Sequence, residues 1–192
     1  MFNLKLHHSD KYANVIIRVI AWKIDMLVLN LPFLFVIYVM LSQPNITDGV
    51  TNFFYLVAYV MLPLLFVQFL YHFYCISTWG KTLGKAIVGL EVADDKGKLL
   101  TRTQAFMREN VTKGVSAVLL GVGFWAVAFN RNHQAWHDEF VGSYVYKKEN
   151  RWLLGLLAVF GLIAVYAVVS VWLFQMAVTS PLVGEIKTYL PF

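Results

Sequence analysis

Three charged residues in an otherwise apolar chain are spaced so that they could bind or move ions: Arg18, Asp25 and Asp138. Arg18 and Asp25 stand seven residues apart, just where a long apolar run begins. Seven residues turn a helix by about 700°, so the two side chains lie on nearly one face, about 10 Å apart along the axis. Because that separation is too long for an ideal direct pair, we expect Asp138 to join them in a polar cluster.

Such a cluster has two interpretations. In the structural one, Arg18 clamps one or both aspartates, and a strongly paired aspartate stays ionised and carries no proton at neutral pH. In the functional one, Arg18 pairs with Asp138 and leaves Asp25 partly uncompensated, as a site for a proton or a sodium ion. Competition between the two for one carboxylate is the physical basis of cation and proton exchange.

Asn30, Gln68 and His72, on the first two predicted transmembrane helices, are secondary candidates for an ion or proton site. Pro32 removes the amide that would bond to the carbonyl of Val28, so a nearby carbonyl and the side chain of Asn30 could help to coordinate a cation. Gln68 and His72 stand four residues apart on one face of the second apolar run. All three are more commonly packing residues than ligands.

Other spacings that suggest chemistry carry less weight. His133 and His137 are four apart and Asp138 follows, but no second acidic or cysteine motif supports a metal site. The segment GKTLGK lacks the spacing of a phosphate-binding loop, so Lys81 and Lys85 are expected to contact anionic lipid headgroups instead. No nucleophile, base and orienting acid fall together, so neither catalytic residues nor a cofactor are expected, and the chain is not expected to be an enzyme.

Composition places these residues in a membrane protein. Of the 192 residues, 59% are hydrophobic and 14% are charged, whereas soluble domains carry about a quarter charged residues. Runs long enough to cross the hydrocarbon core occur at about 15–41, 52–76 and 152–178. We therefore predict an all-α polytopic membrane protein with three transmembrane helices, in contact with the lipid bilayer and with no nucleic-acid partner.

Orientation follows from the positive charges. The loop from Ser42 to Asn52 contains no Lys or Arg, while the segment from Ser77 to Lys113 contains seven. This asymmetry predicts a cytoplasmic N-terminus, and a bacterial inner membrane is the default location.

A fourth apolar stretch, residues 114–130, is short and is interrupted by Gly121 and Gly123. If it crossed the membrane, the basic segment after it would lie outside, against the charge distribution. We expect a re-entrant segment packed against the spanning helices or a second subunit. The alternative is a fourth, short transmembrane helix.

The remaining segments predict small elements on the cytoplasmic side. Residues 86–100 are typical of a β-hairpin with an Asp-Asp-Lys-Gly turn, and residues 101–113 of an amphipathic interfacial helix with Thr101 or Thr103 as its cap. A third strand at 140–146 could pair with the hairpin. We expect one membrane domain over 1–151, followed by an additional helix and tail over 152–192.

These motifs together resemble the RDD family of small membrane proteins, named for an arginine and two aspartates. Arg18 and Asp25 in the first helix, WGKTLGKAIVGLEVADDKGKLL, and Asp138 in QAWHDEFVGSYVY occur in the order typical of that family. The resemblance covers about residues 12–148. The chain departs from the pattern at Gly142-Ser143, where Gly-Thr is expected, and the resemblance does not extend to the last helix.

The resemblance implies two functional hypotheses, because some RDD proteins are associated with sodium and proton exchange and others are accessory membrane components. The first is a small transporter or permeation protein that uses the Arg/Asp/Asp cluster. The second is a non-transporting accessory or scaffolding subunit that binds another membrane protein. Three spans can hardly enclose a path alone, so a homo-oligomer is expected for transport.

Overall fold

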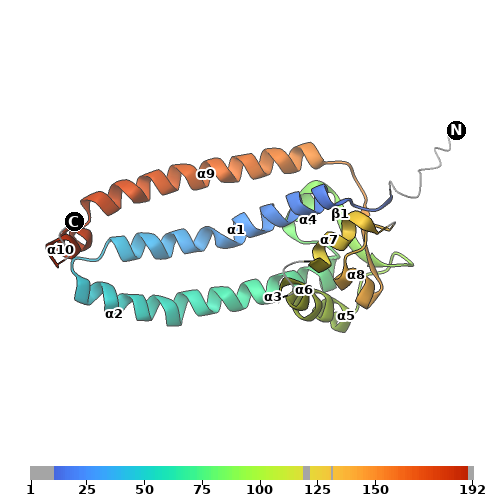
Figure 1. Ribbon diagram of the computed structural model, residues 1–192, viewed down its shortest axis with the longest axis horizontal. Helices are drawn as coiled ribbons and strands as arrows, with labels where there is room; N and C mark the ends of the chain where they lie inside the picture. Colours follow the sequence, from blue (N-terminus) through green and yellow to red (C-terminus); the bar gives the residue numbers. More distant parts are fainter. Residues whose placement is uncertain (1–10, 119–121, 131, 190–192) are drawn as a thin grey trace. The chain divides into compact units, whose positions relative to one another are not determined.

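The structure is a computed structural model that describes residues 11–118, 122–130 and 132–189 (Figure 1). The described chain divides into two compact units. The polar unit comprises residues up to Asp25 together with Phe69–Val159, and the helical unit comprises Met26–Gln68 together with the residues from Phe160 on. Each of the three long helices contributes residues to both units.

Among the described residues, three helices are long and apolar enough to cross a membrane. They are α1 (Val15–Leu41), the continuous helix Ile46–Trp79 and α9 (Trp152–Thr179). The second consists of α2 (Ile46–Leu56), the π-helical turn η2 (Val57–Met61) and α3 (Leu62–Trp79). The π-helical turn ends two residues before Pro63. Proline has no backbone N–H, so it cannot donate the hydrogen bond that a regular α-helix would make back into that turn. The predicted all-α polytopic architecture with three spans is confirmed.

Within the helical unit, polar side chains bond to helix backbone. The Tyr166 hydroxyl of α9 donates to the carbonyl of Leu27 at 2.8 Å. The helix α10 (Pro181–Tyr189) follows α9, and its Glu185 accepts a bond from the backbone amide of Ile46 at 2.7 Å. Glu185 thereby satisfies one of the amide groups that the start of α2 leaves without a helical partner.

The polar unit contains a two-stranded antiparallel sheet whose strands are distant in sequence. Strand β1 (Leu90–Asp94) pairs with β2 (Ser143–Lys147), in a register that runs from Leu90 opposite Lys147 to Asp94 opposite Ser143. The predicted hairpin over 86–100 is therefore wrong, although its turn forms and the Asp94 carboxylate accepts bonds from the amides of Lys96 and Lys98. Strand β1 pairs with this later segment because Val92 and Val145, which stand opposite each other in the register, are both buried.

Short helices flank both strands and shift the predicted boundaries. Helix α4 (Leu83–Val88) takes the residues expected to begin the hairpin, and it ends at Gly89, whose φ of +80° favours glycine. Helix α8 (Trp136–Val141) takes the start of the predicted strand 140–146 and ends at Gly142 with φ of +66°. Two glycine caps thus set where each strand begins.

The helix predicted over 101–113 forms and is longer than expected, while its place at the membrane interface stays a prediction. It runs through α5 (Arg102–Phe106), the π-helical η3 (Met107–Thr112) and α6 (Lys113–Val118), with Thr101 as its cap. Two charged residues of this helix, Arg108 and Glu109, are buried. Their charges are satisfied inside the polar unit, as described below.

The stretch 114–130 forms two short helices, α6 and α7 (Val122–Phe129), while the turn expected at Gly121 lies outside the described residues. Strands β1 and β2 lie before and after this stretch and pair with each other. Both therefore lie on the same side of a bilayer, so the stretch cannot make a single crossing. This pairing rules out the alternative of a fourth transmembrane helix.

Gly84 in α4 allows this helix to lie directly against the backbone of α1. A Cβ added to Gly84 would collide with the backbone carbonyl of Ala21, whereas one added to Gly114 in α6 would meet open space. We predict that Gly84→Ala lowers the free energy of unfolding by about 1–3 kcal/mol, the usual range for overpacking. Gly114→Ala, the matched control, should raise it by up to about 1 kcal/mol, because alanine favours helix. Unfolding in detergent micelles measures both, and equal effects would contradict the predicted contact.

Candidate functional site

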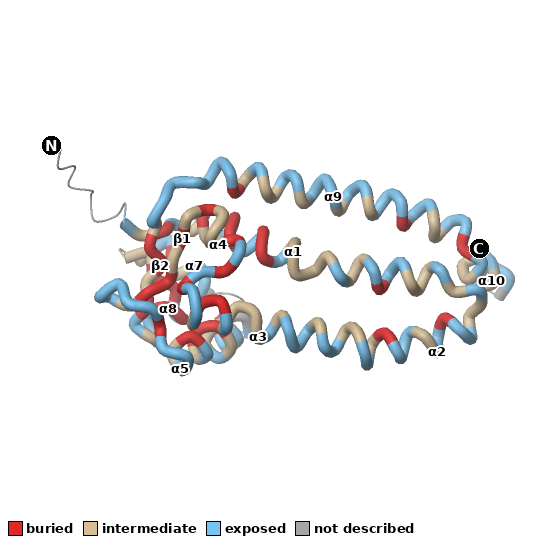
Figure 2. The backbone as a smooth tube through the Cα atoms, turned by 180° about the vertical axis from the view of Figure 1, so that it is seen from behind, coloured by how far each residue is buried: buried red, intermediate tan, exposed pale blue. Residues whose placement is uncertain are grey.

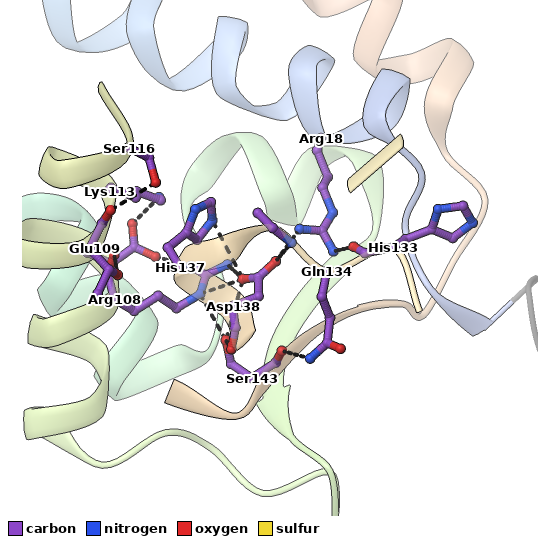
Figure 3. A network of polar contacts seen from close by, with 12 residues as sticks. Arg18, Arg108, Glu109, Lys113, Ser116, His133, Gln134, His137, Asp138 and Ser143 are labelled. Carbon is purple, nitrogen blue, oxygen red and sulfur yellow. Dashed lines mark hydrogen bonds and ion pairs between the residues drawn. The ribbon is translucent and has the colours of Figure 1, made fainter. Parts of the chain in front are cut away.

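Asp138 is the centre of a buried ionic network in the polar unit (Figure 3). Its side chain is 0% exposed, and two arginines hold its carboxylate. Arg18 donates from Nη1 to Oδ2 at 2.5 Å, while Arg108 donates to Oδ1 from Nε at 2.9 Å and from Nη2 at 2.5 Å. The backbone amide of Ala135 adds a bond to Oδ2 at 3.2 Å. Both oxygens of this carboxylate therefore accept charge-assisted bonds.

Arg18 uses its remaining nitrogens to hold backbone. Its Nη2 donates to the carbonyl of His133 at 2.5 Å, and its Nε donates to the carbonyl of Ala13 at 3.0 Å. The planar guanidinium suits such a divided role, since it presents donors in several fixed directions. Arg18 thus fastens the segment from His133 to Asp138 to the first turns of α1.

Arg108 and Glu109 extend the network, and sequence reasoning missed both. Arg108 is 1% exposed and also donates to the Glu109 carboxylate, which in turn forms an ion pair with Lys113. They lie on the π-helical turn η3, a geometry that is often found at functional sites. The one signal in the sequence was the spacing of Glu109 and Lys113, four residues apart with the acid first, which favours a pair on one helix face.

The charges keep both acids of this network ionised. Burial alone would raise the pKa of Asp138, but Arg108 and Arg18 outweigh it and hold that pKa well below its usual range. Burial likewise opposes ionisation of Glu109, yet Lys113 and Arg108 hold its pKa well below normal. Neither carboxylate can release or take up a proton near neutral pH, so the network serves to hold segments together.

His137 stands beside this network as a neutral side chain. Its Nε2 lies 3.6 Å from Oδ1 of Asp138, and its ring contacts Phe124 with centroids 5.4 Å apart. Burial lowers the pKa of His137 to about 3, so the contact with Asp138 is not an ion pair at neutral pH. Within the described residues, no group of three or more His, Cys, Asp or Glu side chains is placed to hold a metal ion.

Asp25 does not join Asp138, and the expected single cluster is divided in two. The Asp25 carboxylate, 1% exposed, accepts bonds from the Thr82 hydroxyl at 2.6 Å, the Gly84 amide at 2.7 Å and the Tyr71 hydroxyl at 3.2 Å. It forms no ion pair among the described residues. Asp25 therefore binds the segment before and within α4, whereas Arg18 binds the segment around α8.

The donors around Asp25 are themselves held in place. Thr82 caps α4 and accepts a bond from the amide of Lys85 at 3.4 Å, and the Tyr71 hydroxyl accepts one from the amide of Leu83 at 2.9 Å. These bonds orient both hydroxyl protons toward the carboxylate. The arrangement connects α1, α3 and α4 through one buried acid.

Lys85 lies near this acid but is not paired with it. Lys85 is half-buried and interacts electrostatically with Lys113, Glu109 and Asp25. Burial, together with the Lys113 cation, lowers the pKa of Lys85 to about 8, against the opposing effect of Glu109. For both Lys81 and Lys85, contact with lipid headgroups stays a prediction.

Among the described residues, none of the secondary candidates Asn30, Gln68 and His72 forms a hydrogen bond with Asp25 or Asp138. In the helical unit, the amide of Asn30 donates to the carbonyl of Met26 at 2.7 Å, and that of Gln68 donates to the carbonyl of Leu29 at 2.8 Å. In the polar unit, the buried Nδ1 atom of His72 has no hydrogen-bond partner among the described residues. The side chains of Asn30 and Gln68 thus donate hydrogen bonds to backbone carbonyl groups of α1.

Ser143, the residue at the departure from the family pattern, contributes its hydroxyl to the network. Ser143 is fully buried, and its Oγ accepts a bond from Nε of Arg108 at 3.2 Å. Its carbonyl accepts a bond from the side-chain amide of Gln134 at 3.0 Å. The change from threonine to serine therefore keeps the hydroxyl that contacts Arg108.

The fold and the two acids define a small polytopic membrane protein in which one spanning helix carries an arginine and an aspartate for two separate buried contacts. The model of the RDD family matches residues 12–142, more than half of the chain. The chain therefore belongs to the RDD family. Comparisons with curated proteins and with solved structures find no match. The family match ends before α9 begins.

Removal of Arg108 tests the network. We predict that Arg108→Met lowers the free energy of unfolding by about 3–5 kcal/mol, because Asp138 and Glu109 would each lose a buried counter-charge. Arg102→Met makes the same change at an exposed position of the same helix and should alter it by less than about 0.5 kcal/mol. Denaturation in detergent compares the two variants. Similar values for both would show that Arg108 does not stabilise the fold.

The pKa of Lys85 generates a prediction on pH. The group has a pKa of about 8 when folded and an ordinary value of 10.5, so the unfolded chain binds more protons between these pH values. The unfolding free energy should therefore rise with pH from about 8 to about 10.5. In Lys85→Met this contribution is absent, and the rise from pH 7.5 to 9.5 should be smaller than in the unaltered protein. Parallel pH profiles would contradict the assignment.

Proposed function

We propose that this RDD-family membrane protein exchanges a monovalent cation, sodium, for a proton, and that Asp25 binds the two in turn. The observation that carries the proposal is the state of the buried acids. Of the three described carboxylates that are buried, Glu109 and Asp138 form ion pairs, and Asp25 accepts bonds only from neutral groups.

The position of Asp25 makes its charge consequential. It is the last charged residue of α1, because residues 26–47 contain none. A carboxylate at the edge of the hydrocarbon core is costly unless a proton or a cation neutralises it. The hydroxyl oxygens of Thr82 and Tyr71 supply further ligands of the kind that sodium accepts. Proton and sodium would thus compete for one site.

Asp138 has a supporting role in this proposal. Its two arginines keep it ionised, so it holds the segment around α8 against α1 and does not exchange a proton. The proposal includes a homo-oligomer, since three spans do not enclose a path, and a bacterial inner membrane with the N-terminus in the cytoplasm. Enzymatic activity forms no part of it.

A second candidate function is that of an accessory subunit that binds another membrane protein. The observation in its favour is α9, which lies outside the family match and buries few of its side chains within the described chain. Its surface is available to lipid or to a partner helix. This candidate predicts no ion flux by the purified protein.

Flux measurements in proteoliposomes decide between the two. We predict sodium-dependent proton movement with the unaltered protein and a loss of more than about tenfold in Asp25→Asn, which corresponds to about 1.4 kcal/mol in the barrier to transport. Asp95→Asn makes the same change in an exposed turn and should retain full flux.

Unfolding in detergent and crosslinking check that Asp25→Asn keeps its fold and oligomeric state. If the unaltered protein shows no flux under either a sodium or a pH gradient, the exchange proposal is wrong and the accessory role is favoured. If Asp25→Asn transports normally, Asp25 is not the site.

A further inference from the structure

The α6–α7 segment and α8 carry a surface of large apolar side chains outside the three long helices. Phe129 is 88% exposed, and Figure 2 shows that much of α7 is exposed. Its members on α6 and α7, called the hairpin face below, are Val118, Trp125 and Phe129. Exposed apolar areas of this kind mark a contact with another protein or with a membrane.

The same segment has a packed inner side. Ser116 and Val127 are buried, and a Cβ added to Gly123 would collide with Ser116 and press against Trp136. Helices α6 and α7 thus pack against each other and against α8, and the hairpin face points outward. The exposed aromatic residues are therefore a property of a folded surface.

Charge favours lipid as the material that covers the hairpin face. Residues 114–130 contain no charged side chain, while Lys113 and Arg131 stand directly before and after them. Apolar residues between two basic residues suit a segment that enters acyl chains and ends at the headgroups. A surface that bound a protein partner by charge complementarity would carry charged residues within it.

The neighbouring spanning helix places this surface near the bilayer. Phe106 of α5 packs its ring against Phe69 and Phe73 of α3, with centroids 6.4 and 5.7 Å apart. Both phenylalanines lie in the stretch 49–80, which contains no charged residue. The helix that leads into α6 and α7 therefore starts beside an apolar part of a transmembrane span.

Helix lengths and strand pairing limit how far the segment can enter. The six residues of α6 and the eight of α7 measure about 9 and 12 Å, less than half of the roughly 30 Å core. The paired strands on either side of the segment require it to return to the side from which it entered.

We propose that helices α6 and α7 insert into the acyl chains of one leaflet without crossing the bilayer. Such an insertion covers the hairpin face with lipid. It also gives the polar unit a membrane contact that is independent of the three spans.

Spin labels on single cysteines test the proposal in proteoliposomes. Cys75, the one cysteine of the chain, is buried and is replaced in a Cys75→Ala background. Labels are placed by Trp125→Cys and Phe129→Cys on the hairpin face, with Phe66→Cys on the lipid-exposed part of α3 and Asp95→Cys in the exposed turn as controls. Collision rates with oxygen and with a water-soluble nickel chelate are then compared.

We expect both hairpin labels to collide with oxygen and to exclude the nickel chelate, as the label at position 66 does. Access to nickel at the level of position 95 would overturn the proposal, because the surface would then face water. Protection from both reagents would also overturn it, because a second copy or another protein would then cover the hairpin face.

A second measurement uses the native tryptophans and needs no label. The fluorescence contributed by Trp125 is the difference between the unaltered protein and Trp125→Phe. We expect lipids brominated in the upper part of their acyl chains to quench this contribution. Unchanged fluorescence of Trp125 in brominated lipid would overturn the insertion even if a cysteine variant failed to fold.

Discussion

The fully buried carboxylate of Asp138 is the group on which the polar unit depends. An ionised acid without water costs several kcal/mol, and only close cations with well-directed hydrogen bonds offset that cost. Arg18 and Arg108 supply them from segments that are 120 and 30 residues away in sequence. The three segments therefore have to assemble together, since any two of them leave a charge buried with too little compensation.

Helix α1 uses two oppositely charged side chains to hold two different segments. Arg18 binds the segment that leads into α8, and Asp25 binds the segment that leads into α4. Gly84 allows α4 to approach the α1 backbone closely enough for the second bond. The seven-residue spacing of Arg18 and Asp25, which is too long for an ideal direct pair, is explained because each has its own partner. The first turns of α1 thus position both strands of the sheet.

Local patterns predicted the parts of this structure that depend on local physics. The spans follow from the length of apolar runs, and the cap at Thr101 follows from residue type. Among partners that are distant in sequence, Arg18 with Asp138 and the strand at 140–146 were expected, but local patterns could not rank the possible strand pairings or find the partners of Asp25 and Arg108. Strand β1 pairs with β2 and not with the adjacent segment, because burial of Val92 and Val145 decides the pairing. Arg108 lies in the segment predicted as an amphipathic helix, and a helical sequence does not show which of its faces meets a distant acid.

The two aspartates, Asp25 and Asp138, have different surroundings that compensate their charges in different ways. An acid between two arginines keeps its charge over the whole physiological pH range, which makes it suitable for holding a structure together. An acid surrounded by hydroxyl and amide groups has no fixed counter-charge, so its charge can be balanced by whatever cation reaches it. Under the proposed exchange, the arginines at Asp138 would keep the fold constant while the occupancy of Asp25 changes. That division requires Arg18 to bind Asp138 and leave Asp25 to neutral donors, which is the arrangement that the structure contains.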